Sequence, residues 1–111
     1  NDFGYIDDVV NLTLLALNNF SKLKGNSPPY RILNIGSNSP IKLKKFINII
    51  EKILNIKSKK RMLALQRGDM VKTYSNSTKI FRLFKYNIRS NHYENVLKFI
   101  KWYKKFYLKK I

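Results

Sequence analysis

Two segments carry apolar residues at α-helical spacing, and this periodicity constrains the fold more than any other feature. In the segment ending at Leu54, the apolar positions are Leu43, Phe46, Ile47, Ile50 and Leu54. In the segment from Asn91 to Leu108, they are Val96, Phe99, Ile100, Tyr103 and Phe106. Residues three or four apart share a helix face, so each segment predicts an amphipathic helix whose apolar stripe belongs to the core or its edge. Ser39 and Pro40 are suited to begin the first of these helices.

Two further helices are expected. One begins at Asp7 or Asp8 and ends at Phe20, and its apolar residues cover more than one face, which predicts burial on most sides. The other is short and runs from Ser77 to Phe84. Residues 21–29 are rich in Gly, Pro, Ser and Asn and predict a surface loop.

Two segments have the character of buried strands. Tyr30 to Gly36 combines branched Ile32 and Ile35 with leucine, and Met62 to Leu65 is a short apolar run before a turn. Alternating helices and strands predict an α/β fold class.

Composition excludes several classes of protein. The chain has 111 residues, enough for one modest core, and no apolar run approaches the roughly 20 residues of a membrane span. It has no cysteine and a single histidine, His92, which exclude disulfides, thiolate chemistry and multi-histidine metal sites. The chain begins with neither Met nor a signal-like segment, so Asn1 is expected to be an internal cut.

The net charge is +17, from 23 Lys and Arg against 6 Asp and Glu. Such an excess is typical of proteins that bind nucleic acid or anionic surfaces, here through lysines of the last helix beside Trp102, Tyr103 and Tyr107. A bias toward residues with A/T-rich codons, with 18 Lys, 13 Asn and 13 Ile, produces the same excess without such a partner. Both interpretations stay open.

No catalytic set is present. The four glycines lie far apart, unlike a dinucleotide-binding loop, and no tyrosine has a lysine four residues later. Asp7 and Asp8 are adjacent and point apart on a helix, which favours capping over catalysis. His92 has no nucleophile near it in sequence and is expected to be a solvated residue at a helix entry.

An ordered series of motifs is more specific than any one of them. It comprises Asp2-Phe-x-Tyr-Ile-Asp-Asp8, Pro-Pro-Tyr-Arg-Ile-Leu-Asn-Ile-Gly36, Ser39-Pro-Ile-Lys-Leu43, Met62 to Leu65, Gln66-x-Gly-Asp69, Thr73-Tyr74 and Phe99-Ile-Lys-Trp-Tyr103. The series resembles the C-terminal third of NAD-dependent nucleotide-sugar epimerases of the extended short-chain dehydrogenase/reductase family. The similarity is strongest to the UDP-glucuronate 4-epimerase branch, of the capsular polysaccharide biosynthesis type.

The resemblance implies a partial domain over residues 1–111. The NAD-binding Rossmann half and all catalytic residues would lie upstream of Asn1, so the chain alone is expected to bind no NAD and to be inactive. The helix from Asp8 and the strand Arg31 to Gly36 would belong to the sheet of that missing half. A UDP-sugar substrate, a cytoplasmic location, no metal and no membrane are implied, with dimerisation only of the full-length protein.

The resemblance also implies a UDP-binding segment. Its positions are Gln66, with Arg67 as a substitute charge, for the diphosphate and Asp69 for the ribose hydroxyls, while Gly68 permits a turn that approaches closely. Outside the family context, such a segment is more often simply a turn.

Three departures from the family pattern weaken that site. Asn1 stands where a phosphate-binding Arg is expected, Val71 replaces a Pro and Asn76 replaces an Asp. The expected functions are therefore a UDP-sugar binding region, a basic nucleic-acid or anionic-surface binder, or a truncated remnant without function and of marginal stability.

Overall fold

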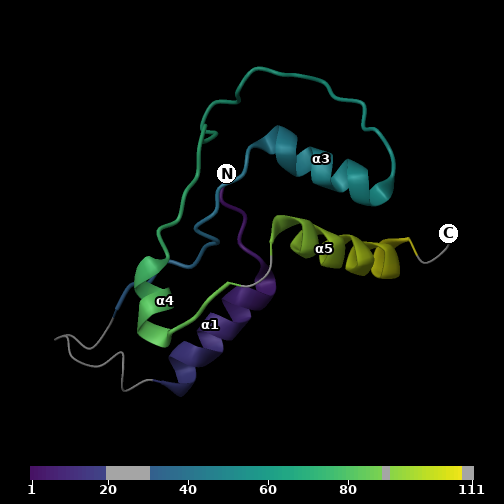
Figure 1. Cartoon of the computed structure of the whole chain (residues 1–111). Coiled ribbons are helices and arrows are strands. Elements are labelled where there is room, and N and C mark those ends of the chain that lie inside the picture. Colours follow the sequence, from purple (N-terminus) through teal and green to yellow (C-terminus); the bar gives the residue numbers. More distant parts are fainter. Residues whose placement is uncertain (20–30, 89–90, 109–111) are drawn as a thin grey trace. The chain divides into compact units, whose positions relative to one another are not determined.

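The computed structural model describes residues 1–19, 31–88 and 91–108 and divides into two compact units (Figure 1). Unit 1 comprises the described residues within 1–40 and 73–89, and unit 2 those within 41–72 and 90–111. Unit 1 contains helices α1 (Ile6–Asn18) and α4 (Thr78–Phe84), and unit 2 contains α3 (Leu43–Leu54) and α5 (His92–Tyr107). The predicted loop of residues 21–29 lies outside the described residues.

All four predicted helices are confirmed, although the first two begin at other residues than expected. The first begins at Ile6, so Asp7 and Asp8 lie inside its first turn, where carboxylates favourably face the positive end of the helix dipole. The second begins at Leu43 rather than at Ser39 or Pro40, so the predicted start there is wrong.

The predicted α/β class is wrong, because every regular element among the described residues is a helix. Residues 31–35 and 62–65 are extended, but neither pairs with a neighbouring strand within the described chain. A strand requires backbone hydrogen bonds to a second strand, whereas a helix satisfies its own backbone. Ile32 and Leu63 are accordingly exposed, at 79% and 69%.

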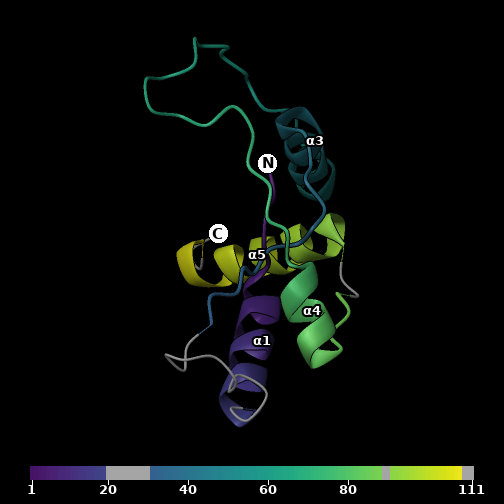
Figure 2. The same cartoon turned by 90° about the vertical axis from the view of Figure 1, so that its left-hand side faces the viewer.

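Unit 1 has a small apolar core between α1 and α4, which lie side by side in both views (Figures 1 and 2). Leu12 of α1 packs with Ile80 and Phe84 of α4, and Leu33 and Ile35 cover part of this cluster. The expectation that α1 is buried on most sides is wrong, because Leu12 is its only buried residue.

A hydrogen-bonded polar cluster joins three distant segments of unit 1. The carboxylate of Asp2 accepts from the backbone N–H of Ser37 at 2.9 Å, from the Ser37 hydroxyl and from the backbone N–H of Ser75 at 3.1 Å. Asn38 Oδ1 accepts from the backbone N–H of Ser77 at 2.7 Å. Gly36 is buried against Ser75, because a Cβ at this position would lie 2.8 Å from the Ser75 hydroxyl oxygen.

Unit 2 is held mainly by α3 packing against α5. Val96 and Ile100 are buried on α5, and Asn91 caps this helix by accepting from the backbone N–H of Glu94 at 2.9 Å. Glu51, in α3, accepts from the backbone N–H of Ser58 at 2.8 Å and pairs with Lys60, both of which follow the helix. These hydrogen bonds from Lys60 and Ser58 lower the pKa of Glu51 to about 2.

Candidate functional site

The predicted UDP-binding segment forms a tight turn in unit 2. The backbone N–H of Asp69 donates to the carbonyl of Gln66 at 3.1 Å, and Gly68 has a φ of +89°. A positive φ at the third position, with Arg67 outside the positive-φ region, is the pattern of a type II turn, which strongly favours glycine there. The turn predicted from Gly68 is therefore confirmed, while its role in binding stays a prediction.

The turn is open to solvent. Gln66, Arg67 and Asp69 are all exposed, and nothing lies within 4 Å of the place where a Cβ of Gly68 would be. An amide and a guanidinium supply N–H donors suited to phosphate oxygens, and a carboxylate accepts from hydroxyl groups. The exposed turn thus offers donors and an acceptor of the kinds that suit a nucleoside diphosphate.

The two internal departures from the family pattern lie on either side of the unit boundary. Val71 is 82% exposed, next to the similarly exposed Met70. Asn76 is in unit 1, where its side-chain oxygen accepts from the backbone N–H of Thr78 at 3.2 Å just before α4. Through this local hydrogen bond, Asn76 helps to stabilise the start of α4.

The aromatic stripe of α5 is placed differently from the prediction. Phe99, Tyr103 and Phe106 were expected in the core or at its edge, but they are 55%, 43% and 55% exposed. Trp102 and Tyr107 are exposed beside them, and the rings contact one another along the helix, with Tyr103 stacked on Tyr107 at a centroid distance of 5.0 Å. Helical spacing correctly predicted which side chains share this face of α5. It did not predict that the face is exposed.

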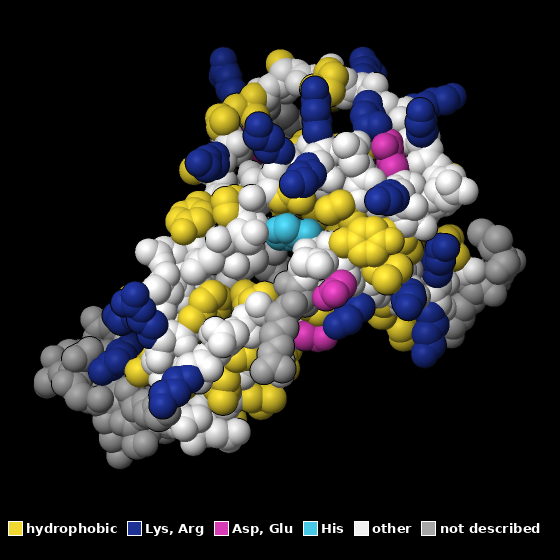
Figure 3. Space-filling view, viewed as in Figure 1, with side chains coloured by type: hydrophobic (Ala, Val, Ile, Leu, Met, Phe, Trp, Pro, Cys, Tyr) yellow, Lys and Arg dark blue, Asp and Glu magenta, His cyan; other side chains and the backbone are white. Residues whose placement is uncertain are grey.

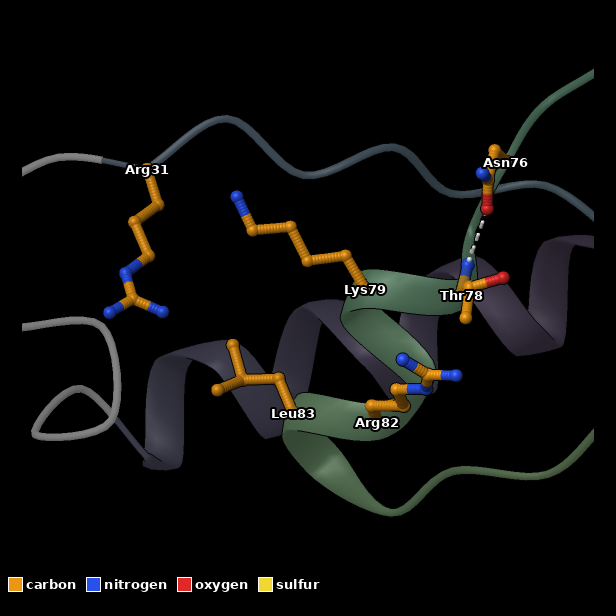
Figure 4. A pocket seen from close by; sticks show the side chains of 6 residues that line it. All are labelled: Arg31, Asn76, Thr78, Lys79, Arg82 and Leu83. Carbon is orange, nitrogen blue, oxygen red and sulfur yellow. Dashed lines mark hydrogen bonds between the residues drawn. The ribbon is translucent and has the colours of Figure 1, made fainter.

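Sequence reasoning missed a cavity of about 540 Å³ in unit 1. Its walls are formed by Arg31, Asn76, Thr78, Lys79, Arg82 and Leu83 (Figure 4). Only the spacing of Lys79 and Arg82, three residues apart on one helix face, was visible in the sequence. Arg31 is too distant in sequence for any local pattern to connect it with them.

The described residues contain neither a metal-binding cluster nor a membrane-spanning helix. No group of three or more His, Asp or Glu side chains in the described part is placed to hold a metal ion. None of the described helices is both long and apolar enough to cross a membrane.

Comparison with known proteins confirms the resemblance. The chain is 36% identical over 113 residues to UDP-glucuronate 4-epimerase 5 of Arabidopsis thaliana, covering 96% of this chain and 26% of that protein. It is 34% identical over 119 residues to the protein CapI of Staphylococcus aureus, covering 97% of this chain and 36% of CapI. It is also 37% identical over 102 residues to an uncharacterized protein of Methanocaldococcus jannaschii, covering 92% of this chain and 29% of that protein.

These matches show the class of protein to which the chain is related. The chain is related to nucleotide-sugar epimerases, and the named relatives are UDP-glucuronate 4-epimerases and CapI. It spans about a quarter to a third of the length of these relatives. No protein-family model matches the chain.

Proposed function

We propose that this chain is the substrate-binding region of an NAD-dependent UDP-sugar 4-epimerase that interconverts UDP-glucuronate and UDP-galacturonate. The observation that carries the proposal is the exposed Gln66–Asp69 turn, in a chain related over nearly its whole length to UDP-glucuronate 4-epimerases. Gln66 and Arg67 donate to the diphosphate, and Asp69 accepts from the ribose hydroxyls. Gly68 lets the backbone approach the ligand without a side chain in between.

The described residues do not fit NAD itself. A dinucleotide site needs glycines that leave open space for the pyrophosphate at the start of a helix. The space beside Gly36 is occupied by the side chain of Ser75. A Cβ on Gly4 would lie 3.9 Å from the Cα of Gly36. In this proposal NAD and the hydride-transfer chemistry therefore belong to other parts of the epimerase, and this chain contributes binding only.

The test is a calorimetric titration of the chain with UDP at low and at moderate salt. We expect saturable binding that Asp69→Asn weakens about tenfold, because a charged acceptor is lost. Asp7→Asn is the matched control, since Asp7 is also exposed but lies in unit 1. Absence of UDP binding, or equal weakening by both variants, contradicts the proposal.

The catalytic part of the proposal needs a separate test. The matching portion of UDP-glucuronate 4-epimerase 5 of Arabidopsis thaliana is replaced by this chain, and the chimera is incubated with UDP-glucuronate and NAD. Formation of UDP-galacturonate that is reduced by Asp69→Asn supports the assigned substrate. A folded chimera that binds UDP but converts no UDP-glucuronate contradicts the assignment of this sugar.

A second candidate function is favoured by the exposed aromatic face of α5. Trp102 and Tyr103 are 46% and 43% exposed, and the exposed lysines Lys101, Lys104 and Lys105 flank them in sequence. Aromatic rings that stack on bases, beside cations for the phosphates, are the elements of single-stranded nucleic-acid binding. Binding of single-stranded DNA that falls steeply with salt and is weakened by Trp102→Ala supports this candidate. Salt-sensitive binding that Trp102→Ala leaves unchanged points to charge alone and contradicts it.

A further inference from the structure

The cavity of unit 1 concentrates positive charge at one place. Arg31 projects from the extended segment before Gly36, and Lys79 and Arg82 project from α4. Figure 4 shows the side chain of Lys79 extending from α4 to the side of the cavity where Arg31 lies. On the face shown in Figure 3, Lys and Arg side chains gather over α4 with no Asp or Glu visible among them.

None of the three cations pairs with a carboxylate among the described residues. The ion pair of Lys60 with Glu51 lies in unit 2 and involves none of these three cations. Asp8, an acidic residue of unit 1, accepts instead from the hydroxyl of Tyr86 at 2.7 Å. Three like charges around one cavity repel one another, so an anion placed among them relieves this repulsion.

The donors are of the kind that recognises phosphate. The Nε of Arg31 is buried without a hydrogen-bond partner in the described part of the chain, although a buried donor is normally satisfied. The planar guanidinium can present two parallel N–H groups to one phosphate, and the Lys79 ammonium acts as a point charge. Because the Asn76 oxygen is held by Thr78, the Asn76 amide group remains available as a donor.

The size of the cavity indicates a small molecule. Small-molecule sites usually measure about 300 to 1,000 Å³, and the volume here is about 540 Å³. Leu83 supplies an apolar wall beside the polar ones, as expected for a ligand with an organic part attached to its phosphates. We infer that Arg31, Lys79 and Arg82 form a second binding site, for a small molecule that carries a diphosphate or two phosphate groups.

This site is independent of the proposed UDP turn, because its residues lie in unit 1 and the turn lies in unit 2. The test is a titration of the full chain with inorganic pyrophosphate at about physiological salt, followed by NMR signals of the backbone and of the Arg31 Nε–H. We expect saturable shifts at residues 76–83 and at the Arg31 Nε–H. Lys79→Gln and Arg31→Gln should each weaken binding about tenfold.

Two controls separate this site from general basicity and from the UDP site. Lys101→Gln removes the same charge from the exposed face of α5 and should change the affinity less than about twofold, since diffuse charge contributes little at this salt. The NMR signals separate the two sites directly, because shifts at residues 76–83 lie in unit 1 and shifts at residues 66–69 lie in the UDP turn of unit 2. If Arg31→Gln fails to fold, Lys79→Gln still tests the inference, because Lys79 is an exposed helical residue whose replacement should not disturb folding.

Three outcomes overturn the inference. The first is absence of saturable pyrophosphate shifts at residues 76–83. The second is equal weakening by Lys79→Gln and Lys101→Gln, which indicates diffuse charge. The third is binding of a short single-stranded DNA at these residues without binding of pyrophosphate, which indicates a nucleic-acid surface.

Discussion

The two units of this chain are stabilised in different ways. Unit 1 joins distant segments by directed contacts, with Leu12 fully buried against α4 and Asp2 hydrogen-bonded to Ser37 and Ser75. Unit 2 relies on one helix pair, and its residues 57–72 are all exposed. Its apolar side chains at Met62, Leu65 and Val71 are more than 60% exposed.

The comparison shows that apolar content does not by itself produce a core. Side chains become buried only where another element covers them, and the extended segment of unit 2 has no covering element within the described residues. Exposed apolar surface of this kind is typical of regions that contact another protein segment. Substitutions should therefore be costly in unit 1 and mild in unit 2.

The largest expected effect is at the centre of unit 1. Leu12→Ala should lower the free energy of unfolding by about 3 kcal/mol, because it removes a fully buried side chain and leaves a cavity. The matched control is Leu17→Ala in the same helix, where the side chain is 73% exposed and the cost should stay within about 0.5 kcal/mol.

Hydrogen exchange resolves this effect by unit. Amides of α1 and α4 should lose protection in Leu12→Ala, while those of α3 and α5 keep theirs. Equal loss of protection in all four helices contradicts the division, because the two units would then unfold as one.

The next largest effect is expected at Gly36. Gly36→Ala should cost about 2 kcal/mol, because its Cβ would meet the Ser75 side chain and force the polar cluster apart. Gly4→Ala is the control, since a Cβ there has only an ordinary van der Waals neighbour at 3.9 Å. Urea unfolding of both variants checks the prediction, and an equal cost would show that the close approach of Gly36 to Ser75 carries no stability.

Removal of the Asp2 carboxylate should cost about 1.5 kcal/mol, because Ser37 and Ser75 lose a charged acceptor at a partly exposed site. The cost should also depend on pH. Burial alone would raise the pKa of Asp2, but hydrogen bonds from Ser37 and Ser75 outweigh it and lower the pKa below 3.8.

Because the folded state has the lower pKa, this stabilisation is complete above about pH 5 and is lost as the pH falls below 3.8 through the folded pKa. Urea titrations of the wild type and Asp2→Ala between about pH 7 and pH 2 should therefore converge at the acid end. Asp69→Ala serves as the control, since this carboxylate is exposed and lies in unit 2. Curves of Asp2→Ala that stay parallel to the wild type contradict the role of the charge.

The helices were predictable because their signals are local. The spacing of Leu43, Phe46 and Ile50 lies within a few turns, and Asn91 is a capping residue at the correct place. Whether the segments around Ile32 and Leu63 form strands could not be predicted from their own residues, because a strand needs a pairing partner that is distant in sequence. The same limit explains why burial of Leu14, Phe99 and Tyr103 was predicted wrongly.

The candidate sites divide in the same way. The turn at Gly68 was predictable because its requirement for a positive φ is a property of four consecutive residues. The cavity with Arg31 was not, since Lys79 lies far from Arg31 in sequence and only folding brings both to one cavity. A local sequence signal thus predicts the backbone conformation of a turn. Charged side chains that come together from distant segments can be recognised only from the tertiary structure.

The smallest expected effect is in unit 2, at the cap of α5. Asn91→Ala should cost about 1 kcal/mol, because the backbone N–H of Glu94 loses its acceptor. Asn91→Ser is the conservative control and should recover most of the loss, since a serine hydroxyl can accept the same bond.

Exchange of the Glu94 amide should accelerate in Asn91→Ala, while amides of α1 and α4 keep their rates. A cost above that of Leu12→Ala would reverse the comparison, because a single cap would then support unit 2 more strongly than the buried leucine supports unit 1. A cost near 1 kcal/mol confined to α5 would sharpen it, because the effect of the cap would then stay within its own helix.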